Sequence, residues 1–247
     1  MKLQRYTLSL QKNYLTTNRG LVIYMSKNII VAIDEVDLDN AKKILNSLNS
    51  DKCIIKIGSV AFNSIGNDII NFAAKKGFEI FLDLKIHDIP NTVKKSILGL
   101  ISLPLKMLTI HISGGKAMMM AAMDAVSGSD IKVFGVTALT SLSDEDTNEI
   151  YQRSVKDQVN AMLDLAESAE IDGVVCSPHE LELVGKRDSL LSITPGIRLQ
   201  NLKDDQKRFM KPKEAIDLGA DYLVIGRPIT ASENISKAFD EIYLSIK

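Results

Sequence analysis

The sequence predicts an α/β protein built as a single (β/α)8 TIM barrel, with its active site at the C-terminal ends of the strands. From Asn28 onward, short β-branched runs alternate with helical patterns, which is typical of parallel strands joined by crossover helices. Eight such units follow one another, and this number fits a closed barrel better than an open sheet. Polar residues also gather directly after the strands in the sequence, at the C-terminal strand ends where barrel enzymes have their active sites.

The expected elements follow in chain order. Strands are expected at residues 29–33, 53–57, 79–84, 107–110, 132–136, 173–176, 191–193 and 222–225. Helices are expected at residues 39–49, 64–76, 91–102, 116–126, 155–170, 178–184, 212–218 and 234–246, and the acids at 144–146 indicate a further helix start on the surface. An open doubly wound sheet would need a Gly-rich turn after its first strand, but residues 33–37 provide none and the chain has no G-x-G-x-x-G.

The composition is that of a globular protein. The 247 residues are enough for one barrel or two smaller domains, and no Pro/Ser-rich linker divides them. A net charge of -1 gives no electrostatic reason to expect nucleic acid or a membrane surface as a partner. No apolar run approaches the roughly 18 residues that a spanning helix needs. We therefore expect neither a nucleic-acid nor a membrane partner.

The first 24 residues differ from the rest. Residues 1–24 mix polar and apolar side chains, contain no acid, and are followed by Met25 and a strong strand. No compact apolar core with a small-residue cleavage site is clear, although a basic, acid-free segment would also suit a transit peptide. We expect residues 1–24 to be an N-terminal extension outside the fold, with Met25 as the functional start, and residues 25–247 to form the barrel.

No metal site is expected. Cys53 and Cys176 lie in apolar strand-like runs and are interpreted as reduced core residues. The three histidines lie far apart and form no ligand pattern.

Residues 81–92 carry an unusual group of charges. Asp83 and Lys85 are two apart at the end of an apolar strand, so their side chains point to the same side, and Asp88 follows three residues later. Burying such charges requires a partner network or a function. The simpler alternative is a strand that frays into solvent with a surface ion pair. The position at a barrel strand end favours a site instead.

Two Gly/Arg turns follow the last two strands. Residues 222–229 form an apolar strand that ends in Gly226 and Arg227, and residues 194–198 place Gly196 and Arg198 after the preceding strand. Barrel enzymes often bind phosphate at these two loops, where glycine admits a close backbone approach and arginine offers a charged fork. The pattern predicts a phosphorylated ligand.

Several motifs occur together in one order. They are Val31-Ala32-Ile33-Asp34, Lys56-Ile57-Gly58, the run from Asp83 to Thr92, His111-Ile112-Ser113-Gly114-Gly115, Val136-Thr137-Ala138-Leu139-Thr140-Ser141, Thr194-Pro195-Gly196-Ile197-Arg198, Asp205-Gln206-Lys207-Arg208 and Ile225-Gly226-Arg227-Pro228-Ile229. In these motifs the chain from Met25 to Lys247 resembles the orotidine 5′-phosphate decarboxylase family, in its bacterial-type branch.

The resemblance implies a reaction and a catalytic array. Orotidine 5′-monophosphate would lose CO₂ to give uridine 5′-monophosphate in de novo pyrimidine biosynthesis, in the cytoplasm and without a metal or organic cofactor. Lys56, Asp83, Lys85 and Asp88 would form the array, in which Lys85 gives its proton to C6 of the pyrimidine. The substrate carboxylate would lie against Asp83. Asp34 would bind ribose hydroxyls, and Lys56 would bridge the ribose and Asp83.

The remaining roles also follow from the resemblance. Asp88 and Thr92 would reach into the neighbouring subunit's site, so a homodimer is expected. The other substrate-binding positions are Thr140 beside the base, with Arg198, Gln206, Gly226 and Arg227 at the base edge and phosphate. The chain departs from the bacterial pattern at Leu199, where proline is usual, and its loop to Gln206 is about one residue shorter. The resemblance implies that this loop closes over the ligand, so the departure bears on its closed conformation.

Two other functions share parts of this pattern. Decarboxylases and aldolases that act on sugar phosphates also carry D-x-K-x-x-D, but they use Mg²⁺ and place a glutamate where this chain has Lys56. A non-catalytic nucleotide-binding protein on a decayed barrel would have lost Asp83 or Lys85, and both remain. Chelator sensitivity would indicate the first alternative, and binding without turnover the second.

Overall fold

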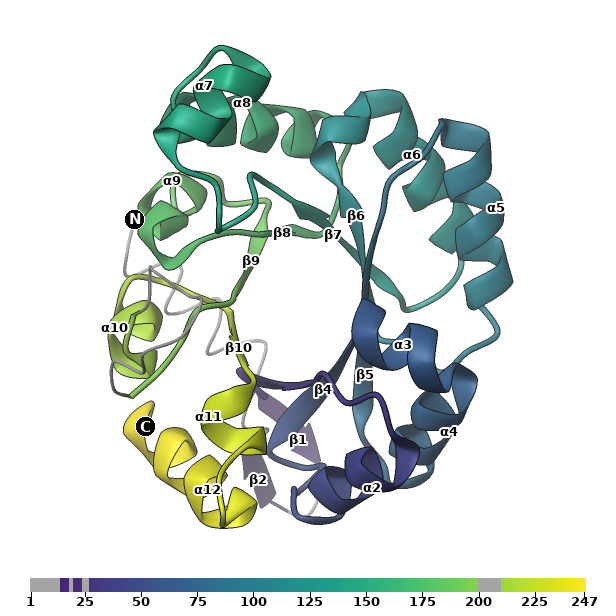
Figure 1. Cartoon of the computed structure of the whole chain (residues 1–247), viewed down its shortest axis with the longest axis vertical. Helices are drawn as coiled ribbons and strands as arrows, with labels where there is room; N and C mark the ends of the chain where they lie inside the picture. Colours follow the sequence, from purple (N-terminus) through teal and green to yellow (C-terminus); the bar gives the residue numbers. More distant parts are fainter. Residues whose placement is uncertain (1–13, 18–19, 24–26, 200–209) are drawn as a thin grey trace.

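A closed parallel barrel forms the body of the molecule (Figure 1). The computed structural model describes residues 14–17, 20–23, 27–199 and 210–247. The barrel strands are β3 (Ile29–Ile33), β4 (Cys53–Gly58), β5 (Glu79–Ile86), β6 (Met107–His111), β7 (Lys132–Val136), β8 (Gly173–Val175), β9 (Leu191–Thr194) and β10 (Tyr222–Ile225). They pair in chain order, and β10 closes the ring on β3. The predicted fold class is confirmed.

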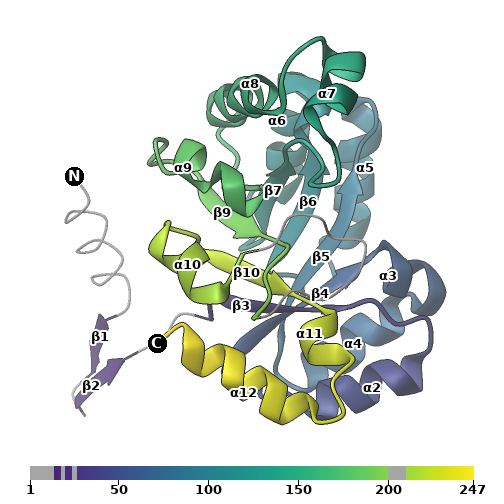
Figure 2. The same ribbon diagram turned by 60° about the vertical axis from the view of Figure 1, so that its left-hand side comes forward.

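Helices surround the barrel on the outside (Figures 1 and 2). They are α2 (Leu38–Asn46), α3 (Ser59–Ile65), α4 (Asn67–Lys75), α5 (Pro90–Leu100), α6 (Gly115–Val126), α7 (Asp144–Tyr151), α8 (Val155–Ser168), α9 (Leu181–Val184), α10 (Pro212–Asp217), α11 (Arg227–Thr230) and α12 (Ile235–Ser245), with 3₁₀ turns η1 (Ile112–Gly114) and η2 (Pro178–Glu180). Within the part of the chain that the structure describes, none of these helices is long and apolar enough to cross a membrane.

The apolar strands pack on both faces. All five residues of β3 are buried, as expected for a parallel strand covered by helices outside and by side chains inside. One core cluster lies between strands and helices, and a smaller one fills the barrel interior around Phe81, Phe134 and Ile193. The rings of Phe81 and Phe134 meet edge to face at 6.4 Å. Cys53 and Cys176 are free and buried, as the apolar runs predict.

Most expected helices and strands differ from the observed ones by one to three residues at an end, and two differences stand out. The single helix expected at residues 64–76 is wrong, because Gly66 adopts φ 72° and ψ −145°, which ends α3 and begins α4. Strand β5 extends two residues further than expected, through Lys85 to Ile86. The helix start predicted from the acids at 144–146 is confirmed by α7, whose Ser143 cap accepts from the Asp146 N–H.

The segment before the barrel contains a short hairpin. Strands β1 (Tyr14–Thr17) and β2 (Gly20–Ile23) pair antiparallel with each other in a two-stranded sheet separate from the barrel sheet (Figure 2).

Candidate active site

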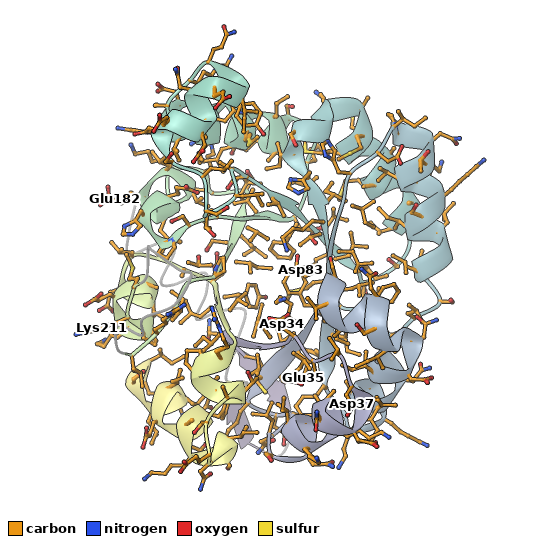
Figure 3. The ribbon with its side chains drawn as sticks, in the orientation of Figure 1. Asp34, Glu35, Asp37, Asp83, Glu182 and Lys211 are labelled. Atoms are coloured by element: carbon orange, nitrogen blue, oxygen red, sulfur yellow. The ribbon has the colours of Figure 1, made fainter. Side chains whose placement is uncertain are left out.

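A cavity of about 280 Å³ lies at the C-terminal ends of the barrel strands. This volume is near the lower end for small-molecule sites, roughly 300 Å³. The predicted site residues that line it are Asp34, Lys56, Asp83, Lys85, Thr140, Arg198, Gly226 and Arg227. Its apolar lining comes from the barrel interior, through Ala32, Phe81, Val175, Ile193 and Val224. Figure 3 shows Asp34 and Asp83 near the centre of the barrel in this view.

Four charges alternate in sign across this cavity. The Nζ of Lys56 lies 3.4 Å from Asp34 Oδ1 and 3.4 Å from Asp83 Oδ2. The Nζ of Lys85 donates to both oxygens of Asp83, at 2.9 and 2.8 Å. The side chain of Asp83 is only 9% exposed, and that of Lys56 only 12%. The structure therefore brings Asp83 and Lys85 together in a network around a buried carboxylate rather than at a frayed strand end.

Gly58 gives the Lys56 ammonium its space. A Cβ at this position would lie 2.9 Å from Lys56 Nζ and 3.4 Å from Asp34 Oδ1. Gly58 pairs with Asp83 across the β4–β5 ladder, so it stands at the edge of the charge array. The sequence motif contains Gly58, but this role is visible only in the structure.

Strand β5 bulges where it carries these charges. Leu82 pairs with Leu108 and Ile86 with Ile110, so three residues of β5 face Thr109 alone on β6. Lys85 adopts φ 50° within this bulge. The left-handed region costs a non-glycine residue about 1–2 kcal/mol, so surrounding contacts must hold Lys85 in place.

Thr109 provides one such contact and was not singled out from the sequence. Its hydroxyl donates to Asp83 Oδ1 at 2.9 Å and accepts from the Lys85 N–H at 2.9 Å, and the residue is fully buried. Threonine is common in strands, and Met107-Leu108-Thr109-Ile110 is an ordinary strand sequence, so no signal marked it.

The Asp83 carboxylate is held in its charged form. Burial alone would raise its pKa, but the ammonium groups of Lys56 and Lys85 and the hydrogen bonds from Lys85 and Thr109 outweigh that effect. Together they hold the pKa of Asp83 below its ordinary value of 3.8. The site therefore presents a permanent negative charge beside the Lys85 ammonium at neutral pH.

Two histidine rings pack beside the array. The rings of His87 and His111 lie 5.3 Å apart. Burial, His87 and Lys85 lower the pKa of His111 below 6.5, and the charge of Asp83 opposes them. We interpret His111 as a group that supports the site and does not itself line the cavity.

The opposite side of the cavity is built from turns. Gly196 has φ 80°, and the backbone on either side of residues 199–209 is joined by hydrogen bonds between Arg198 N–H and Met210 C=O and between Met210 N–H and Gly196 C=O. Arg198 is 4% exposed and lines the cavity. Gly226 precedes the short helix α11, whose first residue is Arg227. Both Gly/Arg turns therefore face the same cavity.

Three predicted residues fall outside this cavity description. Asp88 is exposed on the loop after β5, where its carboxylate accepts from the Ile89 N–H at 2.7 Å. Asp88 and Thr92 are not among the residues that line the cavity of the single chain. Gln206 lies outside the described residues. Within the described ranges, no group of three or more His, Cys, Asp or Glu is placed to hold a metal ion.

Comparison with known proteins agrees with this geometry. The model of the "Orotidine 5′-phosphate decarboxylase / HUMPS family" matches residues 27–242. The chain belongs to this family. Among curated members, the orotidine 5′-phosphate decarboxylase of Ehrlichia chaffeensis is 44% identical over 222 residues, which are 88% of this chain and 96% of that protein. The enzyme of the same name from Coxiella burnetii is 44% identical over 227 residues, 89% of this chain and 96% of that protein.

Two solved structures have the same fold. The orotidine 5′-phosphate decarboxylase of Lactobacillus acidophilus superimposes with a TM-score of 0.80 at 33% identity, covering 90% of this chain and all (100%) of that one. An uncharacterized conserved protein from Geobacillus kaustophilus gives a TM-score of 0.77 at 29% identity, covering 89% and 100%. These matches span the barrel that carries the charge array.

Proposed function

We propose that this chain decarboxylates orotidine 5′-monophosphate to uridine 5′-monophosphate and CO₂ in de novo pyrimidine biosynthesis, without a metal or organic cofactor. The observation that carries the proposal is the Lys85 ammonium, bonded to both oxygens of the buried Asp83 in a cavity whose far side holds two Gly/Arg turns. The family and the curated relatives support the reaction, and the site supports its mechanism.

Lys85 acts as both cation and acid. When the bond from C6 to the carboxylate breaks, CO₂ leaves and the electron pair stays on C6, outside the ring π-system. A positioned positive charge stabilises such a carbanion as it forms. The Lys85 ammonium then gives a proton to C6, which yields the product and a neutral amine.

Asp83 acts on the departing group. In this binding mode the substrate carboxylate lies against the Asp83 carboxylate, and two like charges about 4 Å apart repel by roughly 4 kcal/mol at an effective dielectric constant of about 20. Loss of CO₂ removes this repulsion, while the Lys85 ammonium attracts the new charge at C6. Both effects favour the transition state over the bound substrate.

The phosphate end supplies binding energy far from the reacting carbon. The phosphate would be held by Arg227 and by the backbone at Gly226. The phosphate and the base edge would be contacted by Arg198, Gln206 and Thr140. Asp34 and Lys56, which lie 3.4 Å apart, would bind the ribose hydroxyls. Binding at this end can help to order the site around the base.

The working enzyme is proposed to be a cytoplasmic homodimer whose subunits share sites. Asp88 stands exposed on the loop after β5, and Thr92 lies in the first turn of α5. From there both would reach the partner's cavity and complete the array of Lys56, Asp83, Lys85 and Asp88. Mixing Lys85→Ala with Asp88→Ala protein should restore activity in hybrid dimers; no recovery despite demonstrated subunit exchange would contradict the sharing.

The catalytic domain is proposed to comprise residues 25–247, with residues 1–24 as an extension outside it. The hairpin of β1 and β2 supports this division, since its strands pair with each other. A chain starting at Met25 should retain full turnover; its loss would contradict the division.

A spectrophotometric assay of orotidylate loss tests the reaction. Wild type should turn over with EDTA present, and Lys85→Ala should lose about 10⁴-fold in kcat. Lys42→Ala, at a half-buried lysine on α2 that pairs with Asp39, should keep kcat. Activity that a chelator abolishes would favour the Mg²⁺-dependent sugar-phosphate enzymes instead. Binding of uridine 5′-monophosphate without turnover would favour a non-catalytic binding protein.

A further inference from the structure

We propose that Thr109 is a positioning residue for this reaction: its hydroxyl joins the Asp83 carboxylate to the Lys85 backbone and so sets the direction of the Lys85 ammonium. The inference rests on the proposed function, since it concerns the proton donor of that reaction. Thr109 itself does not line the cavity. It acts through the two residues that do.

The Thr109 hydroxyl acts both as a hydrogen-bond donor and as an acceptor. It donates to Asp83 Oδ1 at 2.9 Å and accepts from the Lys85 N–H at 2.9 Å. Thr109 is 0% exposed, so water cannot replace it without rearrangement. A group that is buried in this way and bonded on both sides fixes the relative position of its two partners.

The bulge explains why a side chain is needed there. In a regular parallel ladder, a strand N–H bonds to a backbone carbonyl of its neighbour. Here three residues of β5 face Thr109, and the Lys85 N–H bonds to the threonine hydroxyl. This bond supports the left-handed backbone of Lys85, φ 50°, which its side chain would otherwise disfavour.

The same hydroxyl fixes the rotation of the Asp83 carboxylate. Oδ1 accepts from Thr109 and Lys85, while Oδ2 accepts from Lys85 and lies 3.4 Å from Lys56 Nζ. Both carboxylate oxygens therefore have assigned partners from three strands. Without the Thr109 donor, the carboxylate can turn and the Lys85 ammonium can follow it away from C6.

Substitution of Thr109 separates positioning from packing. Thr109→Val keeps the branched shape and removes both hydrogen bonds, while Thr109→Ser keeps the hydroxyl. Thr147→Val is the matched control, because Thr147 is also 0% exposed, and its hydroxyl donates to backbone carbonyls of Ser143 and Asp144 in α7. It makes the same chemical change at a site remote from the array.

The expected result is a loss in kcat without a comparable change in KM. Thr109→Val should lower kcat about tenfold, as expected for a lost hydrogen bond to a charged group, with KM within about threefold of wild type. Thr109→Ser should restore most of kcat. Thr147→Val should lower Tm by about as much as Thr109→Val does, but should leave kcat unchanged. If Thr109→Val does not fold, Thr109→Ala replaces it in the same assay.

Several outcomes would overturn the proposal. Thr109→Val could keep the kcat of wild type, or Thr109→Ser could have a kcat no higher than that of Thr109→Val. Thr147→Val could also lose as much kcat as Thr109→Val does. If wild type itself does not turn over orotidylate, the proposed function fails, and a crystal structure of Thr109→Val then decides the positioning. Unchanged contacts between Lys85 and Asp83 and an unchanged Lys85 backbone would refute it; a turned carboxylate would support it.

Discussion

The two ends of the barrel carry the same bonding pattern for different purposes. At the N-terminal end, the Ser192 hydroxyl accepts from the Asp221 N–H at 2.9 Å and donates to the Asp221 carboxylate at 3.0 Å. At the C-terminal end, the Thr109 hydroxyl accepts from the Lys85 N–H and donates to the Asp83 carboxylate, each at 2.9 Å. In both cases a buried hydroxyl connects neighbouring strands through a carboxylate.

The surroundings of the two carboxylates differ. Asp221 also accepts from the Ser192 N–H, and its backbone carbonyl accepts from the Asn28 side chain, so it ties the starts of the barrel strands together. Asp83 contacts two ammonium groups and faces the cavity. A hydrogen-bonded carboxylate in this barrel is therefore structural or chemical according to the strand end at which it lies.

Replacing each carboxylate by its amide gives the largest contrast. Asp83→Asn should lower kcat about 10³-fold, because it removes the charge that faces the substrate carboxylate and orients Lys85. Asp221→Asn should keep kcat within about threefold but lose roughly 2 kcal/mol of stability, or about 6 °C in Tm. Kinetics and thermal unfolding of both variants check this. A large kcat loss in Asp221→Asn would contradict the division between the two ends.

Arg227→Ala tests whether the far side of the cavity holds a phosphate. Removing a charged donor from a phosphate should lower kcat/KM by about 10- to 100-fold, mainly through KM. Arg153→Ala, an exposed arginine between α7 and α8, is the control and should be neutral. Steady-state kinetics with orotidylate measure both. An unchanged KM in Arg227→Ala would place the phosphate elsewhere.

Gly58→Ala probes the space beside Lys56. The added Cβ would lie 2.9 Å from Lys56 Nζ, so the ammonium must move away from Asp34 and Asp83. We expect kcat/KM to fall about tenfold with little loss of stability, because the far end of a flexible side chain can shift. Gly99→Ala is the control, since a Cβ there meets nothing within 4 Å. Equal kinetics for the two variants would show that Lys56 needs no such space.

His111 gives the smallest expected effect, on the pH dependence of stability. Its lowered pKa means that the unfolded chain binds a proton more readily than the folded one, so stability falls as pH drops below about 6.5. His111→Asn should reduce this fall between about pH 7 and pH 5, whereas His179→Asn, an exposed control, should not. Urea unfolding at both pH values measures it. Parallel curves for wild type and His111→Asn would contradict the assignment.

The sequence predicts the barrel well because its signals are local. Each strand is a short apolar run, as in β3. The polar residues that directly follow the strands indicate the end of the barrel at which the cavity lies. The break at Gly66 was missed because a glycine inside a helical pattern does not reveal its own backbone angles.

The site was predicted less completely, and for physical reasons. Charged residues such as Asp83 and Lys85 stand out in an apolar strand, whereas Thr109 matters only through a bulge that pairs it with both of them. The role of Gly58 depends in the same way on where the Lys56 side chain folds. Contacts between strands far apart in the sequence are not visible in one chain's residue pattern.

The charge array is proposed to remove CO₂ from orotidylate. The most direct measurement is release of labelled CO₂ from carboxyl-labelled orotidine 5′-monophosphate by wild type in EDTA, with uridine 5′-monophosphate measured in the same samples. We expect one CO₂ for each uridine 5′-monophosphate formed, and release about 10⁴-fold slower with Lys85→Ala. Orotidylate that is bound but unchanged by wild type, or equal release by Lys85→Ala, would contradict it.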